Sequence, residues 1–231
     1  MSSDALSLKR QAAAAAVKFI ESGMVIGLGA GSTAYEALVQ IGEAIRRRGT
    51  ARCGGRPLFR QVAADAERFG IPLTTLDDHP AVDLTIDGAD EVDPQLRVIK
   101  GGGGALLYEK IVAQSSRREI IIVDASKLSP RLGTVWAVPV EVIPFGARAQ
   151  WEFLEEIKRR CRYARPKTGR PSTPTSAISS STPISAQIED VDAVAQAMNN
   201  RAGIVEHGLF LGLVTDLIVA SPEGIRYECR S

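Results

Sequence analysis

The feature that most constrains the fold of this chain is a repeated order of segments. A short apolar strand leads into a glycine-rich or polar turn, and a helix follows. Apolar strands are expected at Met24–Ile26, Ala81–Ile86 and Glu119–Val123. The turns after them are Gly27–Thr33, Asp87–Glu91 and Asp124–Lys127. Parallel strands connected by helices produce this order, so the sequence predicts an α/β fold with a parallel sheet.

Apolar periodicity predicts helices between and after these strands. They span Asp4–Ile20, Ala34–Arg48, Gln61–Phe69, Ala105–Ser115, Ala147–Tyr163 and Val191–Asn199. Further strand-like segments are an edge strand at Ile71–Leu73, a strand at Val135–Val142 and an apolar strand region at Gly208–Ala220.

The composition changes after residue 134, which indicates a second domain. Between Ser172 and Thr182, eight of eleven residues are Ser or Thr, and such low-complexity sequence has little to bury. We expect a Rossmann-like main domain formed by residues 1–134 and 208–231. A smaller α+β domain, residues 135–207, is inserted in it, and residues 165–182 are its atypical part.

The charge and cysteine content exclude several classes of protein. Lys and Arg number 28 against 27 Asp and Glu, a net charge of +1, so no global field attracts nucleic acid or an anionic membrane. Three widely spaced cysteines indicate reduced thiols of a cytoplasmic protein rather than a disulfide framework. Two isolated histidines are too few for a histidine-built metal site, and no apolar run is long enough for a membrane span.

The glycine-rich turn Gly27–Thr33 lies between a strand and a helix, where backbone N–H groups and the helix dipole favour an anion. It does not match a dinucleotide fingerprint, because that pattern requires glycine at Ser32. It also lacks the Walker lysine. Taken alone, the turn has two equally good interpretations. It is either a small phosphate site with the hydroxyl donors Ser32 and Thr33, or a tight turn without a ligand.

Polar turns at several strand ends indicate a ligand site, because ligands of open α/β sheets bind beyond the carboxyl ends of the strands. The Lys100–Gly104 turn adds a further element, and Glu109 follows it by about one helical turn. Glu109 alone fits a solvated helix face, and Asp87–Asp93 alone fits an acidic loop. Their occurrence together favours a site for a small ligand.

Seven segments then occur in an order that is specific to one family. They are Gly27–Ala34, Leu76–Pro80, Asp87–Asp93, Lys100–Ala105 with Glu109 and Lys110, Val123–Lys127, Pro139–Gly146 and Val205–Phe210. In these residues the chain resembles the type A ribose-5-phosphate isomerase family. The resemblance covers nearly the whole chain except residues 46–60 and 163–183.

The resemblance implies interconversion of ribose 5-phosphate and ribulose 5-phosphate through an enediolate, in the pentose phosphate pathway and without metal or cofactor. It implies that Glu109 is the base that moves the proton between C1 and C2, and that Asp87 handles hydroxyl protons and ring opening. Lys100 and Asp90 would hold the substrate oxygens. The implied substrate-binding residues are Lys9, Ala30, Gly31, Ser32, Thr33, Gly88, Ala89, Gly101, Gly102, Gly103 and Lys127. A homo-oligomer, dimer or tetramer, is implied as well.

The chain departs from the family in two places. Ala30 stands where the family usually has threonine, which removes one hydroxyl near the phosphate. Residues 165–182 lack the family's Thr-Asp-x-x-Asn strand. We hypothesise a frame slip or a mis-spliced exon, with the frame restored near Pro183. The reason is that residues 174–182 can be encoded in the frame next to one reading Thr-Asp-Gln-Arg-Asn-Phe-Ile-Leu-Asp. Resequencing the gene and finding the present frame intact would reject this hypothesis.

Two alternatives to an ordinary isomerase remain open from the sequence. One is a non-catalytic sugar-phosphate-binding domain of a regulator, which would need a helix-turn-helix partner and no Glu109. This chain starts almost directly at its first expected helix, which leaves no room for that partner. The other is an isomerase impaired by a damaged small domain, and it rests on the Ser- and Thr-rich segment.

Overall fold

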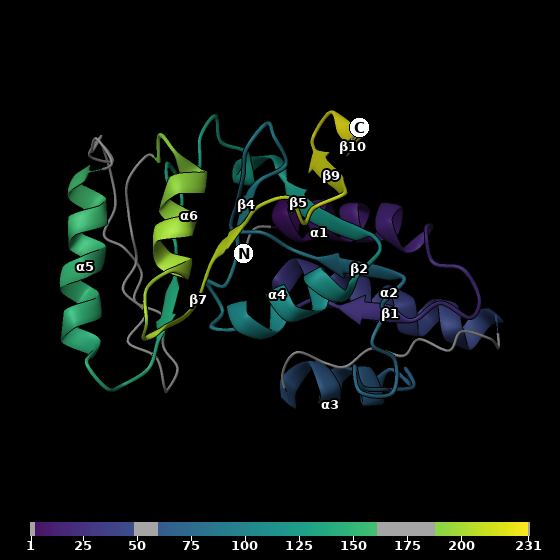
Figure 1. Ribbon diagram of the computed structural model, residues 1–231. Helices are drawn as coiled ribbons and strands as arrows, with labels where there is room; N and C mark the ends of the chain where they lie inside the picture. Colours follow the sequence, from purple (N-terminus) through teal and green to yellow (C-terminus); the bar gives the residue numbers. More distant parts are fainter. Residues whose placement is uncertain (1–2, 49–59, 161–187, 231) are drawn as a thin grey trace. The chain divides into compact units, whose positions relative to one another are not determined.

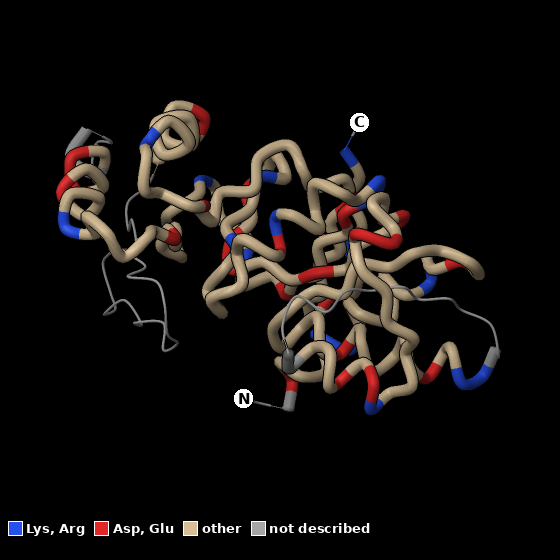
Figure 2. Tube along the Cα trace, turned by 60° about the horizontal axis from the view of Figure 1, so that its bottom comes forward, with Lys and Arg blue, Asp and Glu red and all other residues tan. Residues whose placement is uncertain are grey.

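A computed structural model describes residues 3–48, 60–160 and 188–230 of the chain. They belong to two compact units (Figure 1). Unit 1 comprises residues 1–88, 108–126 and 213–231, and unit 2 comprises residues 89–107 and 127–212. Acidic and basic residues are interspersed along the described chain (Figure 2).

Unit 1 is built on a five-stranded sheet with the order β1-β2-β5-β9-β10. Its strands are β1 (Ile26–Leu28), β2 (Leu84–Asp87), β5 (Glu119–Asp124), β9 (Asp216–Ser221) and β10 (Gly224–Cys229). The first four are parallel, and β10 pairs antiparallel with β9. The predicted parallel α/β sheet is therefore confirmed.

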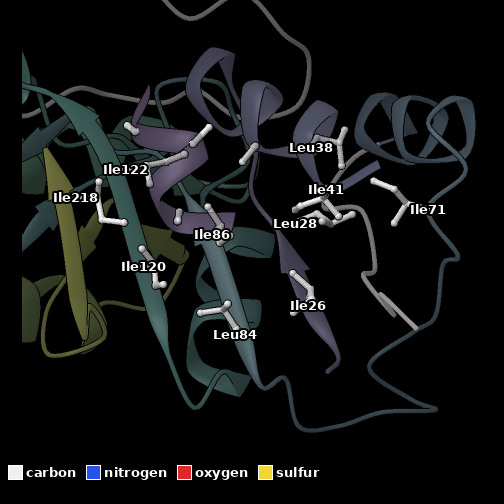
Figure 3. Close-up of a cluster of buried hydrophobic side chains, with 14 of the residues drawn as sticks. Ile26, Leu28, Leu38, Ile41, Ile71, Leu84, Ile86, Ile120, Ile122 and Ile218 are labelled. Carbon is white, nitrogen blue, oxygen red and sulfur yellow. The ribbon is translucent and has the colours of Figure 1, made fainter. Parts of the chain in front are cut away.

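The main core of unit 1 lies on one face of this sheet. Side chains of a strand alternate between the two faces, and Ile26, Ile86 and Ile122 belong to the set that points to this core (Figure 3). Helices α1 (Ser3–Val17) and α2 (Ser32–Arg48) cover it. Full burial of one such side chain stabilises the fold by about 1.5–3 kcal/mol.

Small side chains let α1 approach the sheet closely. Ala12, Ala13 and Ala16 are fully buried in the core of unit 1, and alanine also has the highest helix propensity. Arg10 forms an ion pair with Glu36 of α2, with 3.0 Å between Nε and Oε2. These contacts fix α1 against α2.

Two further helices, α3 (Arg60–Arg68) and α4 (Leu106–Ser115), also pack in unit 1. A Cβ atom at Gly27 of β1 would collide with Thr85 of β2 and with Val112 of α4. These residues belong to the face opposite the main core. Helix α4 therefore packs on this second face, and Gly27 provides the space for the contact.

Unit 2 contains two small antiparallel sheets. One consists of β3 (Glu91–Val92), β4 (Val98–Ile99) and β8 (Leu209–Phe210), and the other of β6 (Val140–Val142) and β7 (Ile204–His207). Its helices are α5 (Ala147–Arg160) and α6 (Val191–Asn199), and a 3-10 turn, η1 (Ala125–Lys127), leads into the unit. The core of unit 2 includes Val140, Leu154, Met198 and Leu209.

Most predicted elements are present, with shifted ends. The helix Val191–Asn199 is confirmed at both bounds, and the Asp190 carboxylate caps it by accepting the Ala193 N–H at 2.9 Å. The predicted edge strand Ile71–Leu73 is wrong, because this described segment has no strand. Ile71 instead inserts into the core of unit 1 as part of a loop. The strand expected at Val135–Val142 is limited to β6.

The boundaries of the two units differ from those we expected. Residues 89–107, 127–134 and 208–212 belong to unit 2 rather than to the main domain. The reason is that β3 and β4 pair with β8 and not with the parallel sheet. The atypical residues 165–182 lie outside the described residues. Among the described helices, none is long and apolar enough to cross a membrane.

Candidate active site

The loop between β1 and α2 has the geometry of an anion site. Gly31 has a φ of 93°, a left-handed conformation that glycine adopts without strain. Ser32 is the first residue of α2, so the N–H groups of Ser32 and Thr33 belong to the first turn of that helix. Such N–H groups and the helix dipole favour a bound anion.

Lys9 brings a positive charge to this loop. Its Nζ atom donates a hydrogen bond to Oγ of Ser32 at 2.7 Å. The two residues lie on different helices, 23 positions apart in the sequence. The structure thus brings together two of the residues expected to bind phosphate, which strengthens the anion-site interpretation of the glycine turn.

Asp87 is held by the same loop. It ends β2, is 1% exposed, and its Oδ1 accepts the N–H of Ala30 at 3.2 Å and of Gly88 at 2.6 Å. A Cβ atom at Gly29 would collide with this carboxylate. Gly29 is therefore required for the approach of Asp87, and Ala30 contributes to the site through its backbone N–H.

Glu109 lies in the first turn of α4 and is buried, with 6% of its surface exposed. The neighbouring Lys110 is buried to the same extent. The solvated-face interpretation of this pair is therefore wrong. A buried carboxylate in a helix that borders a glycine turn is a candidate general base for a bound substrate.

In unit 2, a buried lysine opens the second glycine turn. Lys100 follows β4 and is 3% exposed, and its Nζ lies 5.6 Å from the centre of the Phe210 ring. Its backbone N–H donates to the carbonyl of Gly208 at 2.9 Å. A Cβ atom at Gly208 would collide with the carbonyl oxygen of Lys100. The Val205–Phe210 motif thus supports the lysine through close backbone packing.

Asp90 organises the turn that follows Lys100. Its Oδ2 accepts the N–H of Gly102 at 2.8 Å. Gly101 and Gly104 have φ values of 98° and 81°, and the Gly104 N–H donates to the Gly101 carbonyl at 2.9 Å. Gly103 is exposed, with open space where a Cβ would stand. The turn therefore presents accessible backbone to a ligand, as expected for residues that hold substrate oxygens.

Lys127 ends the η1 turn, and its ammonium faces an aromatic ring. The Nζ atom lies 5.4 Å from the centre of the Trp136 ring. Among the described residues, no carboxylate forms an ion pair with Lys127. Its charge is therefore available to an anionic ligand.

Glu91 lies within the predicted Asp87–Asp93 motif, but its sequence position did not indicate a role. The side chain is fully buried and accepts four backbone N–H groups, from Gly133, Thr134, Val135 and Trp136, at 2.9–3.1 Å. Its position directly after Asp90 was the only indication in the sequence that Glu91 could matter. That position does not reveal a hydrogen-bond partner about 45 residues away.

The chain passes between the two units close to these residues. Three of its four passages come after residues 88, 107 and 126. Each passage lies within two residues of a candidate, namely Gly88 and Asp90 at the first, Glu109 at the second and Lys127 at the third.

Within the described part of the chain, no group of three or more His, Cys, Asp or Glu could hold a metal ion.

Comparison with known sequences gives consistent results. A profile of the family described as "Ribose 5-phosphate isomerase A (phosphoriboisomerase A)" matches residues 57–224. Ribose-5-phosphate isomerase A of Chloroflexus aurantiacus is 51% identical over 223 residues, which cover 96% of this chain and 93% of that protein.

Solved structures are similar over the whole chain. The ribose 5-phosphate isomerase A of Methanocaldococcus jannaschii has a TM-score of 0.85 at 34% identity, covering 97% of this chain and 99% of that chain. A D-ribose-5-phosphate isomerase in complex with phospho-erythronic acid has a TM-score of 0.83, also at 34% identity, with complete coverage of both chains.

Proposed function

Because the chain belongs to the ribose 5-phosphate isomerase A family, we propose that it interconverts D-ribose 5-phosphate and D-ribulose 5-phosphate. The observation that carries the proposal is the loop Gly29–Thr33. One part of it forms the anion site at α2, and another part holds the carboxylate of Asp87. A single short segment thus serves both a phosphate group and a proton-transferring acid.

The reaction requires a proton to move between two neighbouring carbons. Glu109 removes the proton from C2 of the open-chain aldose and returns it to C1, while Asp87 handles the hydroxyl protons and ring opening. The enediolate that forms between these steps carries negative charge on oxygen. Lys100 and the N–H groups of the Gly101–Gly103 turn stabilise it, and one such donor contributes about 3 kcal/mol. The reaction is redox-neutral and takes no electrons from a cofactor.

The phosphate end of the substrate determines how the sugar is oriented. Ser32, Thr33 and Lys9 supply donors at the start of α2, and Lys127 supplies a further positive charge. A structural neighbour was solved with phospho-erythronic acid, a phosphorylated sugar acid. This ligand supports the assignment of a sugar phosphate as the substrate class. The pentose phosphate pathway is the corresponding place in metabolism.

The other functions considered from the sequence are less well supported. Relatives at 42–51% identity are named as ribose-5-phosphate isomerases, and a regulator that only binds sugar phosphates has no use for a buried Glu109. Impairment through residues 165–182 is a separate prediction, because this segment lies outside the described residues. The turnover of the purified protein tests it.

We also propose a homo-oligomer, dimer or tetramer, in the cytoplasm. Unit 2 exposes several large apolar side chains, and contiguous apolar surface is typical of protein interfaces. Phe145 is 88% exposed and Trp151 is 49% exposed. Light scattering after size-exclusion chromatography measures the oligomeric state, and a monomer at micromolar concentration would contradict this part of the proposal.

The decisive experiment is a coupled assay of ribose 5-phosphate isomerisation with the purified protein and its Glu109→Gln variant. Glutamine keeps the shape of the side chain but cannot accept the proton. We expect kcat to fall by at least ~100-fold, the lower end for general-base catalysis, with little change in KM. The matched control is Glu67→Gln, an exposed residue of α3, which should leave kcat unchanged.

Two outcomes would contradict the proposed function and mechanism. Near-normal turnover by a folded Glu109→Gln variant would show that another group is the base. Activity that is lost to a chelator and restored by a divalent metal would show that the reaction is not metal-free.

A further inference from the structure

In unit 2, the buried Glu91 fixes the conformation of the loop Gly133–Trp136. Its two carboxylate oxygens each accept two backbone N–H groups of this loop, and the Trp136 N–H donates to Oε2 at 2.9 Å. Hydrogen bonds to an ionised acceptor are about twice as strong as neutral ones. The backbone that carries Trp136 is therefore held at four consecutive positions.

The Trp136 ring contacts two elements of the candidate active site. It lies under the ammonium of Lys127, 5.4 Å from the ring centre. On the other turn, a Cβ atom placed on Gly102 would be only 3.0 Å from Cζ2 of the ring and 2.9 Å from Oδ2 of Asp90. The ring thus packs against the backbone that Asp90 holds, and it faces the cation expected to bind phosphate.

These contacts form a connected chain of interactions inside unit 2. Asp90 holds Gly102, Gly102 packs against Trp136, and the adjacent Glu91 holds the backbone of Trp136. Lys127 is placed over the face of the same ring. The approach of the ring to Gly102 is closer than most side chains would allow, so a shift of the ring would disturb its packing on one of the two turns.

We propose that Trp136 is a positioning residue that holds the Lys127 ammonium in place for the substrate phosphate. The inference rests on the proposed function for the identity of the phosphorylated ligand. A lysine side chain loses conformational freedom when it is ordered, and an ammonium over an indole face is partly ordered before the ligand arrives. Trp136 acts through Lys127 and not on the reacting carbons.

A purely structural role for Trp136 is the competing explanation, because the ring is also packed against the core of unit 2. The same unit supplies a matched control. Phe153 of α5 is partly buried against the same core, and the Arg201 guanidinium lies 4.6 Å from its ring centre. It forms a cation–π pair of similar burial, but neither partner belongs to a predicted substrate-binding segment.

The test compares Trp136→Leu, Trp136→Phe and Phe153→Leu in the ribose 5-phosphate assay. Leucine keeps the apolar volume but has no aromatic face, so the cation–π contact with Lys127 is lost. The loss of such a contact corresponds to a rise in KM of between about twofold and thirtyfold. The value of kcat should stay within about twofold, because the reacting carbons are not touched. Trp136→Phe restores most of the affinity, and Phe153→Leu leaves KM unchanged. A Trp136→Leu protein with unchanged KM overturns the proposal.

A double variant separates positioning from a general loss of structure. Lys127→Ala should itself raise KM about tenfold or more, and adding Trp136→Leu should then raise it no further. Multiplication of the two effects would mean that Trp136 acts independently of Lys127, which overturns the proposal.

Binding of inorganic phosphate distinguishes this inference from the proposed function. A ligand that binds the folded state raises the melting temperature whether or not the protein turns over a sugar. We expect phosphate to stabilise the wild type and Phe153→Leu, and to stabilise Trp136→Leu and Lys127→Ala markedly less. Failure of the wild type to isomerise ribose 5-phosphate rejects the proposed function alone. An equal phosphate effect in all variants, or none in the wild type, rejects the role of Trp136.

Discussion

Two buried aspartates in the sheet of unit 1 show how differently the same side chain is used. Asp87 is the last residue of β2, and Asp216 is the first residue of β9. Both strands flank β5, where Asp87 pairs with Ile121 and Asp216 pairs with Ile120, so the two carboxylates lie at nearly the same level of the sheet on either side of β5. They are 1% and 3% exposed.

Asp216 is surrounded by side chains that stabilise its charge. Both of its oxygens accept from the Arg118 guanidinium, at 2.7 and 3.1 Å, and it also accepts from the hydroxyls of Thr215 and Tyr227. Burial raises the pKa of the Asp216 carboxyl, but these hydrogen bonds outweigh burial and leave the pKa below its usual value. The Phe19 ring stacks on Tyr227 and lies under Arg118.

Asp87 receives backbone N–H groups from Ala30 and Gly88 instead, and its loop carries the anion site. Burial alone therefore does not identify a functional carboxylate. At Asp216 a guanidinium, a phenol and a hydroxyl join two strands to each other. At Asp87 the carboxylate is tied to the loops that are expected to contact substrate. Removing the two charges should therefore affect different measurements.

The largest expected effect is on the rate when Asp87 is replaced by asparagine. The amide oxygen of Asp87→Asn can still accept the two backbone N–H groups, so the fold should be retained. It cannot exchange protons, and we expect kcat to fall by at least ~100-fold. Coupled-assay kinetics and a melting curve measure both properties. A variant that loses stability but keeps its turnover would reverse the contrast with Asp216.

The Asp216→Asn variant should lose stability rather than activity. The Asp216 side chain is buried but that of Arg118 is 38% exposed, so water can solvate the arginine and we expect a loss of about 1.5 kcal/mol. The free energy of unfolding from urea titration measures it. Because the folded-state pKa of Asp216 is lowered, its contribution is present above the unfolded value of about 3.9. The difference between wild type and variant should shrink as the pH falls through the lower folded pKa. A difference that is constant over pH 2–7 would exclude a charge effect.

Gly29→Ala tests whether the loop positions Asp87. The added methyl group collides with the Asp87 carboxylate, and a displacement of the order of 1 Å at a reacting group lowers turnover by about 10- to 100-fold. The kinetics of the single variant and of Gly29→Ala combined with Asp87→Asn measure the coupling. If Gly29 acts through Asp87, the double variant should be no slower than Asp87→Asn alone, and independent effects would disprove the link.

The smallest effect concerns a third carboxylate, Glu141 of β6, which lies opposite Glu206 of β7. Burial and the negative charge of Glu206 raise the pKa of Glu141. The stability linked to a raised pKa is present below the unfolded value of about 4.3 and is lost as the pH rises through the folded pKa. Glu206→Gln should therefore stabilise the protein by about 0.5 kcal/mol at pH 7, and the gain should disappear near pH 4. A destabilised variant at pH 7 would contradict this assignment.

The order of strands and turns in unit 1 was predictable because its signals are local. The apolar run Glu119–Val123 and the alternation around Leu84 predict strands from neighbouring residues alone, and both strands are present as β5 and β2. Helix α6 was predicted at both ends from its apolar periodicity, and the structure adds Asp190 as its N-terminal cap. These patterns arise from contacts within one element, so they are visible in a linear sequence.

Other elements have no local signal. Strands β3 and β4 are two residues long, and they exist because Val98 and Ile99 pair with Phe210 and Leu209. This pairing assigns residues 89–107 to unit 2. The edge strand predicted at Ile71–Leu73 was wrong for the converse reason: a local apolar pattern is present, but the segment has no strand partner. The pattern arises because Ile71 is buried in the core of unit 1.

For the candidate site, the residue types at the strand ends can be identified from the sequence, because glycine turns and terminal carboxylates follow directly from the local order of the chain. The contacts that those residues make depend on the tertiary structure. The hydrogen bond from Lys9 to Ser32 and the four bonds from the loop Gly133–Trp136 to Glu91 join segments 23 to 45 residues apart. Such contacts depend on how each unit folds around its own core, and no spacing in the sequence encodes the distance between their atoms.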